Sequence, residues 1–144
     1  MVGAFGIQGS AEDQVAAVAL DSSGAVYIAG STSSVDFANL TPSIGAAPSL
    51  GRDVFVAKFD ANVTRCEFLA FIGGASDEDA SSIFVDGNGS AVVAGYTGSS
   101  SFPTTNGAFD RQRNGSTDGF VLKLNPSGDG LVFSTLVGGS SDDF

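Results

Sequence analysis

The stretch "FIGGASDED" at residues 71–79 returns near the end of the chain as "LVGGSSDDF" at residues 136–144. The two stretches lie 65 positions apart, and the whole chain can be laid on itself at that offset without a gap. The matching positions include residues that a Gly-, Ser- and Ala-rich chain does not repeat by chance. They include Asp21 and Asp86, Gly30 and Gly95, Phe55 and Phe120, Lys58 and Lys123, and Phe68 and Phe133. A 65-residue internal repeat therefore organises the chain.

Each repeat contains four short apolar segments, and no window shows the 3.6-residue period of a helix. We expect strands at 15–20, 25–31, 53–59 and 66–72 in the first repeat, and at 80–85, 90–96, 118–124 and 131–137 in the second. An Asp-x-x-Gly turn joins the first two strands of each repeat, with its Asp bonding backbone N–H groups and its Gly at positive φ. The last two strands are apolar on both sides, which predicts sheets that are covered on both faces.

A four-stranded unit that repeats without a helix predicts an all-β chain of two four-stranded β-propeller blades, a partial propeller. A flat blade cannot bury both of its faces alone and needs neighbouring blades. We assign 1–9 to the last strand of a preceding blade, 10–74 and 75–139 to two blades, and 140–144 to the start of a third unit. A β-solenoid and a single sandwich of strands explain the ungapped repeat less well.

Two blades do not close a ring, because propellers have about 4–8 blades. The ring is completed either by further blades of a longer protein, which we favour, or by several copies in a homo-oligomer.

Two overlapping stretches of the second repeat resemble the bacterial SBBP repeat, which is named for a seven-bladed β-propeller. They are "IFVDGNGSAVVAGYTGSSSFPTT" at 83–105 and the sequence from 102 to 143. Both the Asp-x-x-Gly hairpin and the Phe-Pro-Thr-Thr loop are present, as are the Asp-x-Phe-Val strand and the Gly-Gly end. The first repeat departs from this pattern, because its long loop lacks a Pro after Phe37. The resemblance implies a repeat segment of a secreted or cell-surface bacterial protein, and it implies no catalytic activity.

The net charge of −10, from 16 acidic and 6 basic residues, argues against nucleic-acid partners and anionic membrane surfaces. A basic surface, a cationic ligand or Ca²⁺ would be attracted instead. No apolar run approaches the roughly 20 residues of a membrane helix, so we expect no membrane insertion. No signal peptide is visible at the start.

The chain contains no His, which removes Ser–His and Cys–His nucleophile systems and the common zinc sites. We therefore predict no enzyme and no catalytic residue in this chain. Repeated residues are predicted to build the blade, because one catalytic site needs only one copy. Among these, Lys58 and Lys123 are expected near Asp53 and Asp118, and Phe37 and Phe102 are expected to pin the long loops. Cys66 aligns with Leu131, which indicates a buried apolar role.

The long loops at 32–52 and 97–117 and the acidic links between repeats are expected at one common end of the blades, where binding loops would lie. Asp77, Asp79 and Asp142 are the candidate Ca²⁺ ligands, since Ca²⁺ prefers carboxylate and carbonyl oxygens. The same acids fit plain solvated turn charge, or a catalytic carboxylate pair as in glycosidases. No other cofactor is expected.

Arg111 and Arg113 have no equivalent in the first repeat and are the candidate ligand-binding residues, for an acidic protein or a glycan. The sequence therefore predicts a structural scaffold or a protein- or glycan-binding segment. The alternatives are the propeller part of a secreted hydrolase, with its catalytic residues outside this chain, and a Ca²⁺-binding surface module.

Overall fold

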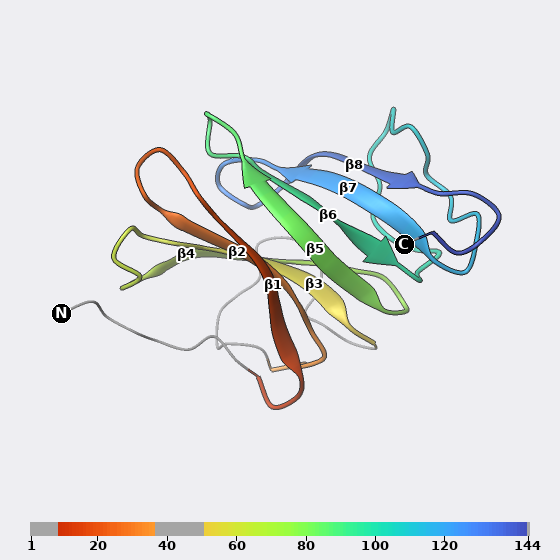
Figure 1. The fold of residues 1–144 in the computed structure, drawn as a ribbon, viewed down its shortest axis with the longest axis horizontal. Coiled ribbons are helices and arrows are strands. Elements are labelled where there is room, and N and C mark those ends of the chain that lie inside the picture. Colours follow the sequence, from red (N-terminus) through yellow and green to blue (C-terminus); the bar gives the residue numbers. More distant parts are fainter. Residues whose placement is uncertain (1–8, 37–50, 144) are drawn as a thin grey trace.

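The computed structural model describes residues 9–36 and 51–143, and throughout these residues the protein is all-β without a helix. The first sheet contains β1 (Asp13–Leu20), β2 (Val26–Thr32), β3 (Asp53–Phe59) and β4 (Cys66–Ile72). The second contains β5 (Glu78–Val85), β6 (Ala91–Thr97), β7 (Asp118–Leu124) and β8 (Leu131–Val137). In each sheet the four antiparallel strands follow one another in chain order (Figure 1).

The predicted all-β class and the two four-stranded units are confirmed. β3, β4, β7 and β8 have the predicted bounds, while β1 and β5 begin two residues earlier and β2 and β6 are shifted by one residue. The two sheets close no ring within the described residues, so the propeller assignment stays a prediction. The predicted extra strand at 1–9 falls, apart from Gly9, outside the described residues.

A bulge in the first strand of each sheet explains two of the repeated residues. In β1 the pairing shifts between Val15 and Ala17, beside Gly30 of β2. A Cβ on Gly30 would overlap the carbonyl oxygen of Gln14 and the ring of Phe55. The glycine and the aromatic ring recur together because the ring fills the space above a strand glycine. The same arrangement returns 65 residues later with Asp79, Gly95 and Phe120.

The Asp-x-x-Gly turns form as predicted. Asp21 Oδ1 accepts hydrogen bonds from the backbone N–H groups of Ser23 (2.9 Å) and Ala25 (3.0 Å), and Gly24 has φ of 85°. Asp86 accepts from Asn88 (2.9 Å) and Ser90 (3.0 Å) in the same way. These side-chain bonds add to the backbone bonds of each turn, in which the N–H of Gly24 donates to the carbonyl of Asp21 and the N–H of Gly89 to the carbonyl of Asp86, and together they fix the hairpin.

The lysine prediction is wrong. Lys123 Nζ lies 2.7 Å from Asp86 Oδ2, and Lys58 Nζ lies 3.1 Å from Glu67 Oε2 and 4.0 Å from Asp21 Oδ2. Asp53 and Lys58 stand at opposite ends of β3, and at about 3.3 Å per residue the strand keeps them apart. Each lysine therefore pairs with acids at its own end of the sheet, Lys123 with the turn residue Asp86 and Lys58 chiefly with Glu67 of β4.

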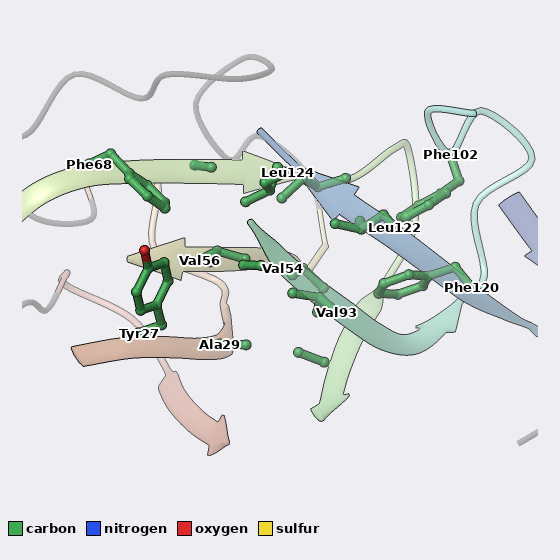
Figure 2. Packing of buried hydrophobic residues seen from close by; sticks show 14 of the residues in the cluster. Tyr27, Ala29, Val54, Val56, Phe68, Val93, Phe102, Phe120, Leu122 and Leu124 are labelled. Atoms are coloured by element: carbon green, nitrogen blue, oxygen red, sulfur yellow. The ribbon is translucent and has the colours of Figure 1, made fainter. Parts of the chain in front are cut away.

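The core of the protein is the seam between the two sheets. The trailing face of the first sheet carries Tyr27, Ala29, Val54, Val56, Phe68, Ala70 and Ile72. The leading face of the second sheet carries Ala80, Ala91, Val93, Phe120, Leu122, Leu124 and Leu136. Figure 2 shows side chains of both sets pointing toward one another, and all of them are at most 9% exposed. The burial of two apolar faces against each other is the dominant stabilising contribution.

Specific contacts fix the register of this seam. β5 lies against β1, β2 and β3 of the first sheet. The N–H of Ala80, at the bulge in β5, donates to Ser31 Oγ at 3.1 Å. The Tyr27 hydroxyl donates to the carbonyl of Gly89 at 3.1 Å, so the turn of the second sheet is tied to β2.

The outer faces of the pair differ from the seam. The leading face of the first sheet carries a smaller cluster of Phe55, Ala57, Phe59, Leu69 and Phe71, with Cys66 packed against it as predicted. The trailing face of the second sheet carries Val92, Ala94, Val121, Phe133 and Val137, of which Phe133 is 39% and Val137 49% exposed. No helix in the described residues could cross a membrane.

Candidate functional site

The link between the sheets, residues 73–77, lies at one end of the molecule beside the second long loop and the described ends of the first, as predicted. Asp77 of the link accepts a hydrogen bond at Oδ1 from the N–H of Arg52, the last residue of the first long loop, at 2.8 Å. The carbonyl of Asp77 accepts from the N–H of Gly98, at the start of the second long loop, at 2.9 Å. A polar hollow of about 300 Å³ opens here, lined by Ser76, Asp77, Asp79, Tyr96, Gly98 and Thr117.

The carboxylates proposed as Ca²⁺ ligands already have partners. Arg52 makes a two-pronged ion pair with Asp79, with Nη2 to Oδ2 at 2.6 Å and Nε to Oδ1 at 2.9 Å. This pairing raises the pKa of Arg52. Asp142 lies on the following link, where it accepts from the hydroxyl of Ser116. The structure therefore places Asp77 and Asp79 beside one hollow and Asp142 at another loop.

Calcium binding stays a prediction. Within residues 9–36 and 51–143, no three acidic or cysteine side chains gather into a metal site. A Ca²⁺ ion in the hollow would have to displace Arg52 from Asp79. A Ca²⁺ ion at the turn that starts with Asp86 would have to displace the ammonium of Lys123.

A buried carboxylate at the start of β5 is the most constrained polar group of this end. Glu78 is fully buried, and its Oε1 accepts from Thr97 Oγ1 at 2.7 Å. Its Oε2 accepts from the N–H of Gly74 at 2.9 Å, and its own N–H donates to the carbonyl of Arg52 at 2.7 Å. Burial raises the pKa of Glu78, while hydrogen bonds from Ser99 and Thr97 act in the opposite direction. The Glu78 side chain thereby connects the link, at Gly74, to strand β6, at Thr97.

The same carboxylate recurs in every unit. Asp13 Oδ2 accepts from the N–H of Gly9 at 2.7 Å, and Asp143 Oδ2 accepts from the N–H of Gly139 at 2.6 Å. Positions 13, 78 and 143 are 65 residues apart, as are the glycines at 9, 74 and 139. In the sequence, Asp13, Glu78 and Asp143 stand within the acidic links and look like surface charge, so their role was not predicted. The joint recurrence of the acid and its glycine is the signal that would have found it.

The second long loop lies along β8. The N–H of Thr105 donates to the carbonyl of Ser134 at 3.0 Å, and the N–H of Leu136 donates to the carbonyl of Asp110 at 3.0 Å. The loop therefore satisfies backbone groups on the outer edge of the sheet, which otherwise would pair with other chains. Phe102 is 5% exposed and stacks on Phe120 with ring centroids 4.6 Å apart. The prediction that this ring pins the loop is confirmed, whereas Phe37 lies outside the described residues.

The two candidate arginines sit in this loop and contact it separately. Arg111 Nε donates to Thr104 Oγ1 at 3.4 Å at the exposed surface. Arg113 Nη1 donates to the carbonyl of Gly115 two residues ahead. A shared ligand site at the two guanidinium groups stays a prediction.

Two apolar hollows lie on the outer faces of the sheet pair. The one on the trailing face of the second sheet has a volume of about 510 Å³, and its lining includes Ala94, Val121 and Val137. The one on the leading face of the first sheet has a volume of about 320 Å³, and its lining includes Val15, Ile28 and Phe59. The seam covers the trailing face of the first sheet and the leading face of the second. Each hollow lies on the other face of its sheet, so neither hollow is part of the seam.

The chain matches no protein-family model and no curated protein. The functional assignment therefore depends on the sequence and the geometry.

Proposed function

We propose that this chain is a non-catalytic pair of β-propeller blades, a scaffold segment of a secreted or cell-surface bacterial protein of the SBBP-repeat type. The main support for the proposal is the packing of the two sheets against each other in the seam. One sheet packs its trailing face onto the leading face of the next sheet at a 65-residue spacing, and each sheet retains one further apolar face. A stack of this kind extends by addition of further units.

The repeated polar residues support a building role. Asp21 and Asp86 form turns, Asp13 and Glu78 tie links to strands, and Lys58 and Lys123 neutralise acids of their own sheet. Each has a structural partner in both units. This argues against a catalytic assignment, because a catalytic group has to be positioned for a substrate.

Recognition would then fall to residues that do not repeat. The loop 98–117 is held on a rigid sheet by Phe102 and by its backbone bonds to β8, which is the usual setting for binding loops. We assign Arg111 and Arg113 to contacts with an acidic protein surface or a glycan. The alternative, the propeller part of a secreted hydrolase, requires catalytic residues outside this chain. A cytoplasmic location in the native host, found by cell fractionation, would contradict the location in this proposal.

The experiment that tests the scaffold adds a third unit. A second copy of residues 75–139 is joined directly after Gly139, and unfolding is followed by circular dichroism in urea. The added leading face should pack on the trailing face of the second sheet, so the midpoint should rise and the transition should stay single.

The matched control carries Leu122→Asp in the added copy alone, which places a charge on its leading face. This control should return the original midpoint. If the intact added unit leaves the midpoint unchanged and unfolds separately, the two sheets form a sandwich complete in itself and the proposal fails.

A further inference from the structure

The second repeat contains three asparagines that are each followed directly by glycine. They are the pairs Asn88-Gly89, Asn106-Gly107 and Asn114-Gly115, and all three Asn residues are exposed. An Asn in such a pair loses its side-chain amide without an enzyme when the backbone nitrogen of the glycine attacks the side-chain carbonyl carbon. Glycine allows this approach because it has no Cβ and rotates freely. Any difference in reactivity between the three pairs is therefore set by the fold around them.

In the first pair the attacking nitrogen is held by the hairpin turn between β5 and β6. The N–H of Gly89 donates to the carbonyl of Asp86 at 3.0 Å. The carbonyl of Gly89 accepts from the Tyr27 hydroxyl at 3.1 Å, so both backbone groups of this glycine are bonded. Attack on the side chain of Asn88 therefore requires the turn to open first.

In the third pair both reacting groups are bonded to carboxylates. The N–H of Gly115 donates to Asp118 Oδ1 at 3.2 Å, and Asn114 Nδ2 donates to Asp110 Oδ2 at 2.6 Å. A Cβ on Gly115 would overlap the carbonyl oxygen of Ser141, so the backbone is also packed against the following link. Hydrogen bonds to ionised groups are stronger than those between neutral groups, which keeps this pair in place.

The middle pair lacks both kinds of restraint. Asn106 and Gly107 form the corner of a turn in the second long loop, closed by a bond of 3.2 Å from the N–H of Ala108 to the carbonyl of Thr105. Among the residues that the structure describes, none bonds to the N–H of Gly107 or to the side-chain amide of Asn106. A Cβ on Gly107 would meet no atom within 4 Å. Reaction here requires only that the peptide of Gly107 rotates against this one turn.

We propose that Asn106 is a site of spontaneous deamidation in the folded chain, and that the fold protects Asn88 and Asn114. The nitrogen of Gly107 bonds to Cγ of Asn106, its proton passes to the departing amide group, and ammonia leaves a cyclic succinimide. Water then adds to a carbonyl of the ring and breaks the bond between that carbonyl and nitrogen. The product is aspartate or isoaspartate, and each carries a new carboxylate at neutral pH.

The loop is fixed to β8 on both sides of this site, so the isoaspartate product has a structural consequence. The N–H of Thr105 donates to the carbonyl of Ser134, and the N–H of Leu136 donates to the carbonyl of Asp110. Isoaspartate adds a methylene group to the main chain between these two anchor points. The segment then becomes too long for its present path, and its backbone bonds to the edge of the sheet should weaken.

The test keeps the wild-type chain under native conditions in mildly alkaline buffer made with heavy-oxygen water, which labels each carboxylate formed through the ring. Peptide mapping by mass spectrometry gives the rate of conversion at each of the three asparagines. The rate at Asn106 should exceed the rates at Asn88 and Asn114 by about tenfold or more, because each protected site must first lose a hydrogen bond. Equal rates under native conditions, or a slower rate at Asn106, overturn the inference.

Two controls separate the fold from the local sequence. In denaturing urea the protecting bonds are lost, so the three rates should approach one another; an unchanged order would show that the fold does not set it, and the inference would fail. The variant Asn106→Gln keeps an amide but requires a larger ring, which forms more slowly. It should abolish the fast conversion and leave the rates at Asn88 and Asn114 unchanged, whereas a fast conversion that persists would contradict the assignment to Asn106.

Discussion

The two sheets repeat each other in sequence, but residues at equivalent positions differ in how far they are buried. Phe68 and Phe133 are the same residue at the same repeat position, yet one is 9% and the other 39% exposed. On the other side the order is reversed, since Ala80 is 8% exposed and its repeat Val15 is 59% exposed. The residue pattern sets where strands form, whereas the neighbour in the stack sets which face becomes core. Variants at matched positions can therefore separate these two influences.

The largest difference is expected for a charge placed on equivalent valines. Val56 is fully buried in the seam, so Val56→Asp should lower the free energy of unfolding by about 4 kcal/mol. Val121 is only half-buried on the trailing face of the second sheet, and Val121→Asp in the monomer should change it by about 1 kcal/mol or less. Urea denaturation at a protein concentration below association measures both. Equal losses would contradict the distinction between the two faces.

The next difference concerns the repeated phenylalanines. Phe68→Ala should cost about 3 kcal/mol, because it removes a ring packed on Gly128 and against Tyr27. Phe133→Ala should cost about 1 kcal/mol, since much of this ring already contacts water. Thermal and urea unfolding of the two variants should give the same order, and a larger loss at Phe133 would reverse the assignment of the seam.

The third pair of equivalent positions, Gly30 and Gly95, should show equal losses of stability, unlike the two pairs above. Gly30 and Gly95 each lie under a phenylalanine ring and beside a bulge carbonyl of their own sheet. Gly30→Ala and Gly95→Ala should each lower the free energy of unfolding by about 2 kcal/mol through overpacking. This contact lies within a sheet and not between sheets, so the two losses should agree. A tolerated substitution at either site would show that the bulge is not built alike in both units.

The smallest effect is expected at the turn carboxylates in acid. The ammonium of Lys123 and the N–H of Ser90 lower the pKa of Asp86 to about 2, below the usual value of about 3.9. A carboxyl with a lowered pKa in the folded state stabilises the fold above the unfolded pKa, and this contribution is lost between about pH 4 and pH 2. Asp86→Asn should therefore flatten the fall of stability over that range.

Asp21→Asn provides the comparison in the first sheet. The pKa of Asp21 is also lowered, chiefly by the hydroxyl of Ser23, but its Oδ2 lies 4.0 Å from Lys58 Nζ, against 2.7 Å for Asp86 and Lys123. The flattening should be smaller than for Asp86→Asn. Acid titrations of unfolding free energy for both variants check the order, and an unchanged slope in Asp86→Asn would contradict the pairing with Lys123.

Much of the fold could be predicted from the sequence, because the residues that determine it act over short distances along the chain. β3, β4, β7 and β8 are apolar on both faces and stand between turn residues, so their bounds were predicted correctly. The Asp-x-x-Gly turns were predicted because Asp21 and Asp86 act on backbone groups only two to four residues away. Short-range chemistry of this kind needs no knowledge of the tertiary structure.

The errors concern contacts over longer distances. Glu78 looks like surface charge in a sequence, because its burial depends on Thr97 and on the link glycine. The position of the loop 98–117 along β8 depends on backbone bonds that no side chain reveals. Both faces of each sheet are apolar, so the sequence alone did not tell which face of each would be covered.

The central claim is that equivalent positions lie in a closed seam on the first sheet and on an open face of the second. The most direct measurement is the rate of thiol modification of Val56→Cys and Val121→Cys, each in a Cys66→Ala background that leaves one thiol. We predict that the thiol at 121 reacts readily in the folded monomer, and that the thiol at 56 reacts about a hundredfold more slowly, because it is reached only through opening of the seam. Equal rates at the two positions would contradict the account.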